Sequence, residues 1–192
     1  MVKQFEVEQK FRVAAPAELL AALAGRGVTL GDAELQVDCY YAHPQRDFAA
    51  TDEALRIRRI DERNFVTYKG PKLDRTTKTR REIDVAFAPG EAAGAQLADL
   101  LAALSFQPVT EVRKRRRSGH LPWQGFDVIV TLDDVEQVGL YAELEVVADE
   151  AQLDRARACL ASLSAELRLD GGERRSYLEL LLANRSATSG TR

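Results

Sequence analysis

The sequence predicts an α+β fold: an eight-stranded antiparallel β-barrel with a polar, charged lumen and flanking helices. Eight strand-like segments follow one another with few helices between them, which favours an antiparallel sheet that closes into a barrel. Charged residues recur two positions apart in several of these segments. Amphipathic helical stretches lie before, between and after the strands, and they can cover an apolar outer face of the barrel.

The predicted elements follow from hydrophobic periodicity and from Pro and Gly at their ends. Strands are predicted over 4–13, 34–41, 55–61, 64–69, 78–87, 109–118, 126–133 and 141–147. Helices are predicted over 15–26, 90–104, 150–167 and 173–182. Pro16 and Gly25 mark the two ends of the first helix. We expect a single domain over residues 1–185 and a disordered C-terminal tail over 186–192.

Composition limits the class of protein. A chain of 192 residues that is 45% hydrophobic can bury the core of one domain. Cys39 and Cys159 stand far apart and outside any CxxC pattern, so neither a zinc site nor a disulfide framework is predicted. The net charge of −3 argues against nonspecific nucleic-acid binding. With no signal-peptide core and no apolar run near the ~18 residues of a membrane span, we expect a cytoplasmic protein without a membrane partner.

The charged residues of the strands share faces, because residues two apart in a strand point to the same side. Glu6, Glu8 and Lys10 therefore project together. The same spacing occurs in Arg56 and Arg58, Arg80 and Glu82, Lys114 and Arg116, and Glu143 and Glu145, while Lys69 and Asp133 add single charges on other strands. A single pair of this kind is most simply explained by a strand with one face in solvent and the other face on the core. Their recurrence in several strands instead favours charged faces that point into the barrel.

Charges gathered inside a barrel need compensation, because burying an uncompensated ion costs several kcal/mol. Arginine and lysine donate hydrogen bonds to phosphate oxygens, and clustered carboxylates supply the oxygen ligands that Mg²⁺ or Mn²⁺ prefers. A metal-bound triphosphate satisfies both sets of side chains.

These residues belong to short motifs that occur in a fixed order. They are ExExK at 6–10, LRIR at 55–58, TYKGP at 67–71, RRE at 80–82, RKRRR at 113–117, LDDV at 132–135 and ELE at 143–145. The set resembles the CYTH family, the triphosphate tunnel metalloenzymes, which includes class IV adenylate cyclases and thiamine triphosphatases. The segments FAATDEALRIR at 48–58 and RRSYLELL at 174–181 resemble its class IV adenylate cyclase branch.

The resemblance implies a role for each matching residue. Metal ligands would be Glu6, Glu8, Glu143 and Glu145, supported by Asp133 and Glu82. Phosphate would be held by Lys10, Arg56, Arg58, Lys69, Arg80, Lys114 and Arg116. Lys10, Glu8 and Glu143 would be catalytic. In the cluster 113–117 a register shift of one residue would present Arg115 and Arg117 instead.

The implied activity is conversion of ATP to cAMP and pyrophosphate with Mg²⁺ or Mn²⁺. An inorganic tripolyphosphatase or an organic triphosphatase acting on thiamine or nucleoside triphosphates would use the same side chains with water as the attacking group. A non-catalytic module that binds nucleotides or polyphosphate is the alternative of another class. The expected partner is ATP or another triphosphate rather than a nucleic acid, and relatives make a homodimer a reasonable expectation.

Overall fold

The eight predicted strands are all present. The structure, a computed structural model, describes residues 4–71 and 79–189. The strands are β1 (Gln4–Arg12), β2 (Glu34–Ala42), β3 (Ala54–Ile60), β4 (Arg63–Lys69), β5 (Glu82–Phe87), β6 (Gln107–Trp123), β7 (Phe126–Val135) and β8 (Gly139–Asp149). The helices are α1 (Pro16–Ala24), α2 (Phe48–Thr51), α3 (Glu91–Ala103), α4 (Leu153–Glu166, after a 3₁₀ turn at Glu150–Gln152) and α5 (Tyr177–Ser189).

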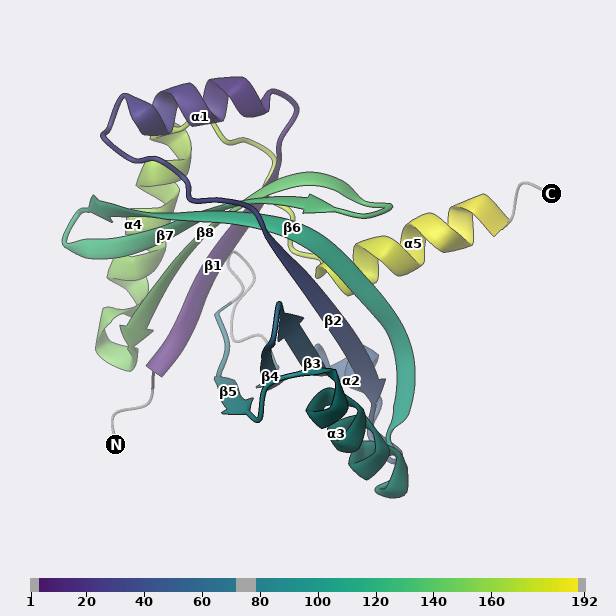
Figure 1. Cartoon of the computed structure of the whole chain (residues 1–192). Coiled ribbons are helices and arrows are strands. Elements are labelled where there is room, and N and C mark those ends of the chain that lie inside the picture. Colours follow the sequence, from purple (N-terminus) through teal and green to yellow (C-terminus); the bar gives the residue numbers. More distant parts are fainter. Residues whose placement is uncertain (1–3, 72–78, 190–192) are drawn as a thin grey trace.

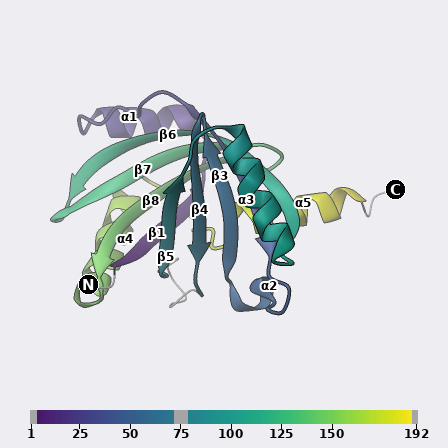
Figure 2. The same cartoon turned by 60° about the horizontal axis from the view of Figure 1, so that its bottom comes forward.

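The strands form one antiparallel sheet in the order β1-β8-β7-β6-β2-β3-β4-β5. The sheet curls around a central space, as Figures 1 and 2 show. Its edge strand β1 meets the segment before β5 at an isolated bridge between Glu6 and Arg80. The Arg80 amide donates to the Glu6 carbonyl at 3.3 Å. Among the described residues the predicted barrel is therefore a curled sheet, with a short seam in place of a full β1–β5 ladder.

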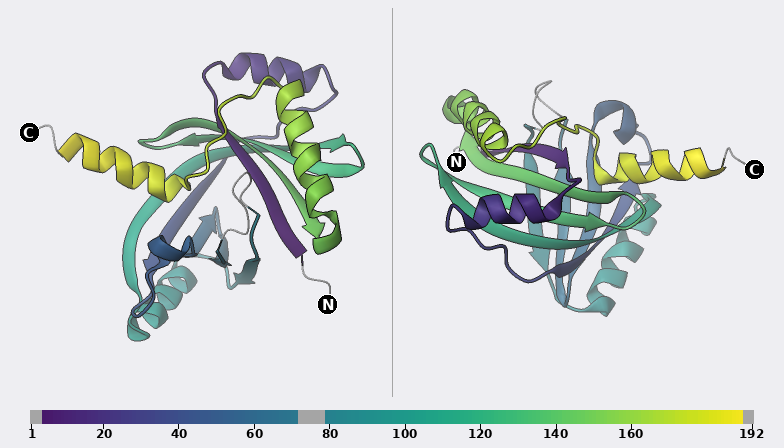
Figure 3. Two further views of the ribbon diagram at one scale, coloured as in Figure 1. Left: turned by 180° about the vertical axis from the view of Figure 1, so that it is seen from behind. Right: turned by 90° about the horizontal axis from the view of Figure 1, so that it is seen from above.

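The inner face of the sheet is polar and the outer face is apolar, as the alternation predicts. On β1, Glu8 and Lys10 face inward, whereas Val7 and Phe11 belong to the largest apolar cluster. Helices α1 and α4 cover this outer face over β1, β8 and β7, and Figure 3 shows both on the outside of the sheet. Fully burying one such aliphatic side chain contributes about 1.5–3 kcal/mol. The outer helices thus stabilise a sheet whose inner face is left for charged groups.

The other two long helices cover different parts of the sheet. Helix α3 packs on β2 and β3, where Leu101 contacts a small cluster with Tyr41 and Ile57. Helix α5 inserts Tyr177, Leu180 and Leu181 against apolar side chains at one end of the inner face. Beyond this first part, α5 extends away from the body of the molecule (Figures 1 and 3).

Several element ends differ from the predictions. Helix α5 begins at Tyr177, and it continues to Ser189, so residues 186–189 are helical where a disordered tail was predicted. Its second half is held through Asn184 and Arg185, whose side chains donate to the carbonyl and side-chain oxygens of Gln137. The predicted start of the fifth strand, Lys78, lies outside the described residues. None of the described helices is both long and apolar enough to span a lipid bilayer.

Candidate functional site

The carboxylates of β1 and β8 face one another inside the curled sheet. In the β1–β8 ladder, Glu8 lies opposite Glu145 and Lys10 lies opposite Glu143. Directly opposed residues on one face have Cβ atoms about 4.5–5.5 Å apart. Glu6, two residues before Glu8, shares the same face. The ladder thus brings together four glutamates that are separated in sequence by more than half of the chain.

The crowding of these carboxylates changes their protonation. Burial, and then the neighbouring Glu6 and Glu8 carboxylates, raise the pKa of Glu145 to about 8. Burial also opposes ionisation of Glu6, but Lys69, Arg80 and Arg56 outweigh it and hold the pKa of Glu6 below its usual value. Lys69 and Arg116 only partly offset burial and the acidic neighbours at Glu145, and a bound cation would favour its charged form further.

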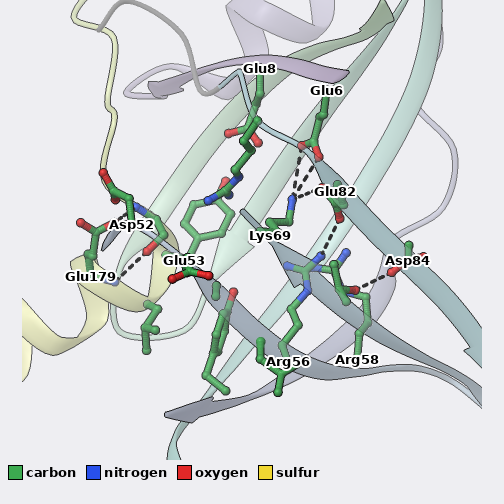
Figure 4. Close-up of a pocket in the computed structure, with 18 of the residues that line it drawn as sticks. Glu6, Glu8, Asp52, Glu53, Arg56, Arg58, Lys69, Glu82, Asp84 and Glu179 are labelled. Carbon is green, nitrogen blue, oxygen red and sulfur yellow. Dashed lines mark hydrogen bonds and ion pairs between the residues drawn. The ribbon is translucent and has the colours of Figure 1, made fainter. Parts of the chain in front are cut away.

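Opposite the glutamates, β3, β4 and β5 carry an ion-pair network. Lys69 Nζ lies 3.2 Å from a Glu6 oxygen and 2.5 Å from a Glu82 oxygen (Figure 4). The Arg56 guanidinium lies 3.8 Å from Glu82. Because burial disfavours its charged form, the pKa of Lys69 is lowered. Arg80 is also buried, and its Nε has no hydrogen-bond partner among the described residues.

On β6, the register left open by the sequence is settled by the side chains. Lys114 and Arg116 point inward and contact Asp133, which is fully buried. The distances are 3.3 Å from Lys114 Nζ and 2.5–2.7 Å from the Arg116 guanidinium. Arg115 is exposed, and Arg117 donates to the carbonyls of residues 30 and 31. Of the two registers that the sequence allows, the structure has the one in which Lys114 and Arg116, rather than Arg115 and Arg117, point inward.

Arg116 also forms an ion pair with Glu143, which ties β6 to the carboxylates of β8. Burial, reinforced by the Arg116 charge, lowers the pKa of Lys114 to about 8. Burial opposes the charge on Asp133 too, but Lys114 and Arg116 outweigh it and lower its pKa. Asp133 does not line the cavity, since its oxygens face Lys114 and Arg116, so its predicted supporting part in metal binding stays a prediction.

All of the predicted inward residues except Asp133 line one continuous cavity of about 880 Å³. They are Glu6, Glu8, Lys10, Arg56, Arg58, Lys69, Arg80, Glu82, Lys114, Arg116, Glu143 and Glu145. We call the part of the cavity that these residues line the charged half. The structure therefore gathers residues from β1, β3, β4, β5, β6 and β8, and Arg80 from the segment that leads into β5, in one place.

The carboxylate oxygens of the cavity are the possible ligands for a divalent metal. Within the ranges 4–71 and 79–189, no three carboxylate, imidazole or thiol side chains form a ready-made metal site. Glu6 and Glu143 are instead paired with Lys69 and Arg116. The chemistry of the donors nevertheless fits, because hard divalent cations prefer clustered carboxylate oxygens, and Glu145 lies among acidic neighbours. Metal binding here requires the ion pairs to exchange partners.

Comparison with known proteins identifies this arrangement. A family model described as the CYTH domain matches residues 4–177. The chain belongs to the CYTH family. Members of the family bind triphosphate substrates, and the family name of triphosphate tunnel metalloenzymes implies a divalent metal.

Two curated relatives of this CYTH chain carry cyclase names. It is 35% identical over 178 residues to "Putative adenylate cyclase MJ0240" of Methanocaldococcus jannaschii, which covers 91% of this chain and 97% of that protein. It is 31% identical over 185 residues to adenylate cyclase CyaB of Aeromonas hydrophila, which covers 92% of this chain and 88% of that protein.

Solved structures share the fold of this CYTH domain. The PH1819 protein of Pyrococcus horikoshii OT3 is 38% identical and superposes with a TM-score of 0.82, covering 94% of this chain and 99% of that one. HpAC1 of Hippeastrum, for which a dominant triphosphatase activity is described, superposes with a TM-score of 0.64. The match covers 94% of this chain and 95% of the HpAC1 chain. At 19% identity, that likeness shows the fold alone.

Sequence reasoning missed Asp38, which pairs with the inward-facing arginines Arg56 and Arg58 of β3. Asp38 is 2% exposed, and it accepts two hydrogen bonds of 2.6 Å from Arg58 and one of 3.3 Å from Arg56. Burial opposes its charge, but the two arginines outweigh burial and hold the pKa of Asp38 well below its usual value. The feature that could have indicated Asp38 is the register of β2 and β3, in which Asp38 lies directly opposite Arg58.

Tyr177 was missed as well. Its ring, at the start of α5, lies 4.1 Å from Lys10 Nζ and 5.1 Å from Lys114 Nζ. Lys10 Nζ also donates to the carbonyl of Arg175 at 2.5 Å. Cation–π contacts of this kind hold both lysines at the edge of the charged half. Tyr177 lies within the segment that resembles the cyclase branch, but nothing in the sequence indicates that α5 reaches the inside of the sheet.

Proposed function

We propose that this CYTH domain binds a metal-bound triphosphate in the charged half and converts ATP to cAMP and pyrophosphate. One observation carries the proposal. The glutamates of β1 and β8 face the buried arginines and lysines of β3, β4 and β6 across one cavity. A polyanion together with a hard cation complements both sets at once. Relatives above 30% identity that are named as adenylate cyclases support the choice of reaction.

The basic side chains would bind the phosphates. Arg56 and Arg58 are held in place by Asp38, and Arg116 is held by Asp133, so their donors are oriented before a ligand arrives. Preorganised donors in a water-poor site stabilise the charge that develops on a departing pyrophosphate. Lys10, Lys69, Arg80 and Lys114 complete the predicted phosphate contacts.

The acidic side chains would hold the metal. A divalent cation bound by Glu6, Glu8, Glu143 and Glu145 would neutralise charge on the phosphate oxygens. When the triphosphate takes over Lys69 and Arg116, the Glu6 and Glu143 oxygens that these cations occupy become available. Glu82 would remain beside Lys69 and Arg56 as a supporting residue.

In the cyclase reaction, the ribose 3′-oxygen forms a bond to the α-phosphorus while the bond from that phosphorus to the bridging oxygen breaks. The hydroxyl proton must be accepted by a group nearby. Lys10, Glu8 and Glu143 are our candidates, since Lys10 and Glu143 are opposed in the β1–β8 ladder and Glu8 lies on the same face.

A triphosphatase is the second candidate. The observation that favours it is that the cations and carboxylates of the charged half match a triphosphate in general. They do not determine whether a ribose hydroxyl or a water molecule attacks the phosphorus. The triphosphatase activity described for HpAC1 belongs to a protein of the same fold. Water attacking the terminal phosphorus would use the same side chains.

The test is incubation of the purified chain with ATP, and separately with tripolyphosphate, under Mg²⁺ or Mn²⁺, with products separated by chromatography. cAMP and pyrophosphate in equal amounts support the cyclase. Phosphate from tripolyphosphate without cAMP from ATP moves the function to hydrolysis. Tight binding of a triphosphate without any turnover indicates a binding module, and chelator controls establish the metal requirement.

A further inference from the structure

The start of α5 is attached to the charged half through Lys10 of β1. The Glu173 amide donates to the Lys10 carbonyl at 2.7 Å, and the Lys10 ammonium donates to the Arg175 carbonyl at 2.5 Å. The short segment that leads into α5 is thus hydrogen-bonded to both the backbone and the side chain of one residue. The next two residues, Ser176 and Tyr177, line the cavity.

Tyr177 brings one aromatic ring against two buried lysines. The ring centroid lies 4.1 Å from Lys10 Nζ and 5.1 Å from Lys114 Nζ. Lys10 is 2% exposed and Lys114 is 3% exposed. The ring also packs edge-on against Tyr141, with 5.6 Å between the ring centroids. Because an ammonium group is attracted to the face of an aromatic ring, one side chain of α5 contacts two of the predicted phosphate ligands.

The positive charges around this ring are only partly offset by carboxylates. Asp133 lies 3.3 Å from Lys114 Nζ, but it also pairs with Arg116. Glu143 pairs with Arg116 as well. Like charges repel more strongly where water is excluded, so a further anion beside the two lysines would favour their arrangement around the ring. A polyanion in the charged half would therefore favour the docked position of α5.

Helix α5 is attached in a way that lets its docking respond to such a ligand. Its buried side chains are those of Tyr177, Leu180 and Leu181, and residues 182–187 are exposed. The helix extends away from the body of the molecule (Figure 1). Gly171, in the linker before it, has φ +67°, a conformation that favours glycine. Segments with few buried contacts open at a low free energy, and a ligand can shift that equilibrium.

We propose that Tyr177 is a positioning residue for Lys10 and Lys114, and that through it polyanion binding in the charged half and docking of α5 stabilise each other. The proposal rests on triphosphate binding in the charged half. Such coupling is reciprocal: the factor by which docked α5 raises the affinity for the polyanion is the factor by which the polyanion favours docking.

The first measurement uses the wild-type full chain and follows amide hydrogen exchange with and without tripolyphosphate and Mg²⁺. Saturating tripolyphosphate should slow exchange at least about fivefold in peptides from α5. Peptides from α3, which packs on the outside of the sheet against Tyr41 and Ile57, should change less than about twofold. Equal protection of the two helices, or faster exchange in α5, would overturn the coupling.

The second measurement compares Tyr177→Leu with Tyr177→Phe, using calorimetry with tripolyphosphate and Mg²⁺ and the same exchange experiment. Tyr177→Leu removes the aromatic face, so affinity should fall about tenfold and the protection of α5 by the ligand should be lost. Tyr177→Phe keeps the aromatic face and should stay within about twofold of wild type in affinity. A merely structural role would change exchange in α5 without ligand, but it would not remove the difference that the ligand makes.

Wild-type affinity in Tyr177→Leu, or equal losses in the two variants, would overturn the positioning role and leave the proposed function in place. If Tyr177→Leu does not fold, the exchange measurement on the wild-type chain still decides. Failure of the wild-type chain to bind tripolyphosphate would remove the proposed function together with this inference.

Discussion

Replacing Asp38 with asparagine should destabilise the protein and at the same time increase the stabilising effect of a triphosphate. In the folded protein, Asp38 is the shared buried partner of Arg56 and Arg58. Removing one partner of a buried ion pair costs about 3–5 kcal/mol, because the other charge stays buried without compensation. Glu82 lies 3.8 Å from Arg56 and retains part of the compensation. We therefore expect about 3 kcal/mol for Asp38→Asn, the lower end of that range.

The same pair predicts a pH dependence. The folded state holds the pKa of Asp38 well below its ordinary value of 3.8. Stability from this group is thus fully present above pH 3.8, and it is lost as the pH falls from there toward the folded-state pKa. Urea unfolding at pH 7 and at pH 3 should show a difference between wild type and Asp38→Asn that narrows at the lower pH.

Ligand addition separates the electrostatic explanation from a general packing defect. Tripolyphosphate supplies phosphate oxygens to Arg56 and Arg58, so it should raise the melting temperature of Asp38→Asn more than that of wild type. Asp127→Asn is a suitable control, since Asp127 is exposed and its side chain pairs with the exposed His120. A loss below about 1 kcal/mol, or an equal ligand effect in both proteins, would refute the reasoning.

Further predictions address the rest of the site and the sheet around it. Glu8→Ala and Glu143→Ala should each abolish metal-dependent turnover while the circular dichroism spectrum stays native; a fully active variant would sink the metal assignment. Treating the wild-type chain with a chelator should stop turnover, and added Mg²⁺ or Mn²⁺ should restore it in a product assay. Arg116→Gln should weaken tripolyphosphate binding at least tenfold in calorimetry, because its guanidinium faces the cavity, whereas the outward Arg115→Gln should have less than twofold effect. Gly119→Ala should lower stability by about 1–3 kcal/mol in urea unfolding without changing affinity, since its Cβ would lie 3.0–3.1 Å from Leu30 and Val28 side-chain carbons; unchanged stability would contradict this packing.

Much of the fold could be predicted because the alternation of charged and apolar residues in the sequence indicates strands. Glu6, Glu8 and Lys10 alternate with apolar residues, and this alternation alone indicates two different faces. The ends of elements were less predictable. Strand β6 continues to Trp123 because its pairing with β7 runs up to a tight turn at Gln124 and Gly125, which both have positive φ.

The candidate site was predictable where neighbouring charges repeat, and unpredictable where the partner lies on another strand. Asp38 is a single acidic residue among Val37, Cys39 and Tyr40, so no local pattern indicates its role. Only the register that places it opposite Arg58 shows that it is a buried counter-ion.

The pairing of β1 with β8 has a consequence for biosynthesis. Gln4 to Arg12 pair along the whole strand with residues near the end of the sheet. At about 5–20 residues per second, the ribosome needs on the order of ten seconds to make the intervening chain. During that time the first strand has no partner, and unpaired strands are prone to join other chains unless charged side chains oppose this. On this strand, Glu6, Glu8 and Lys10 are charged side chains of the kind that opposes such association.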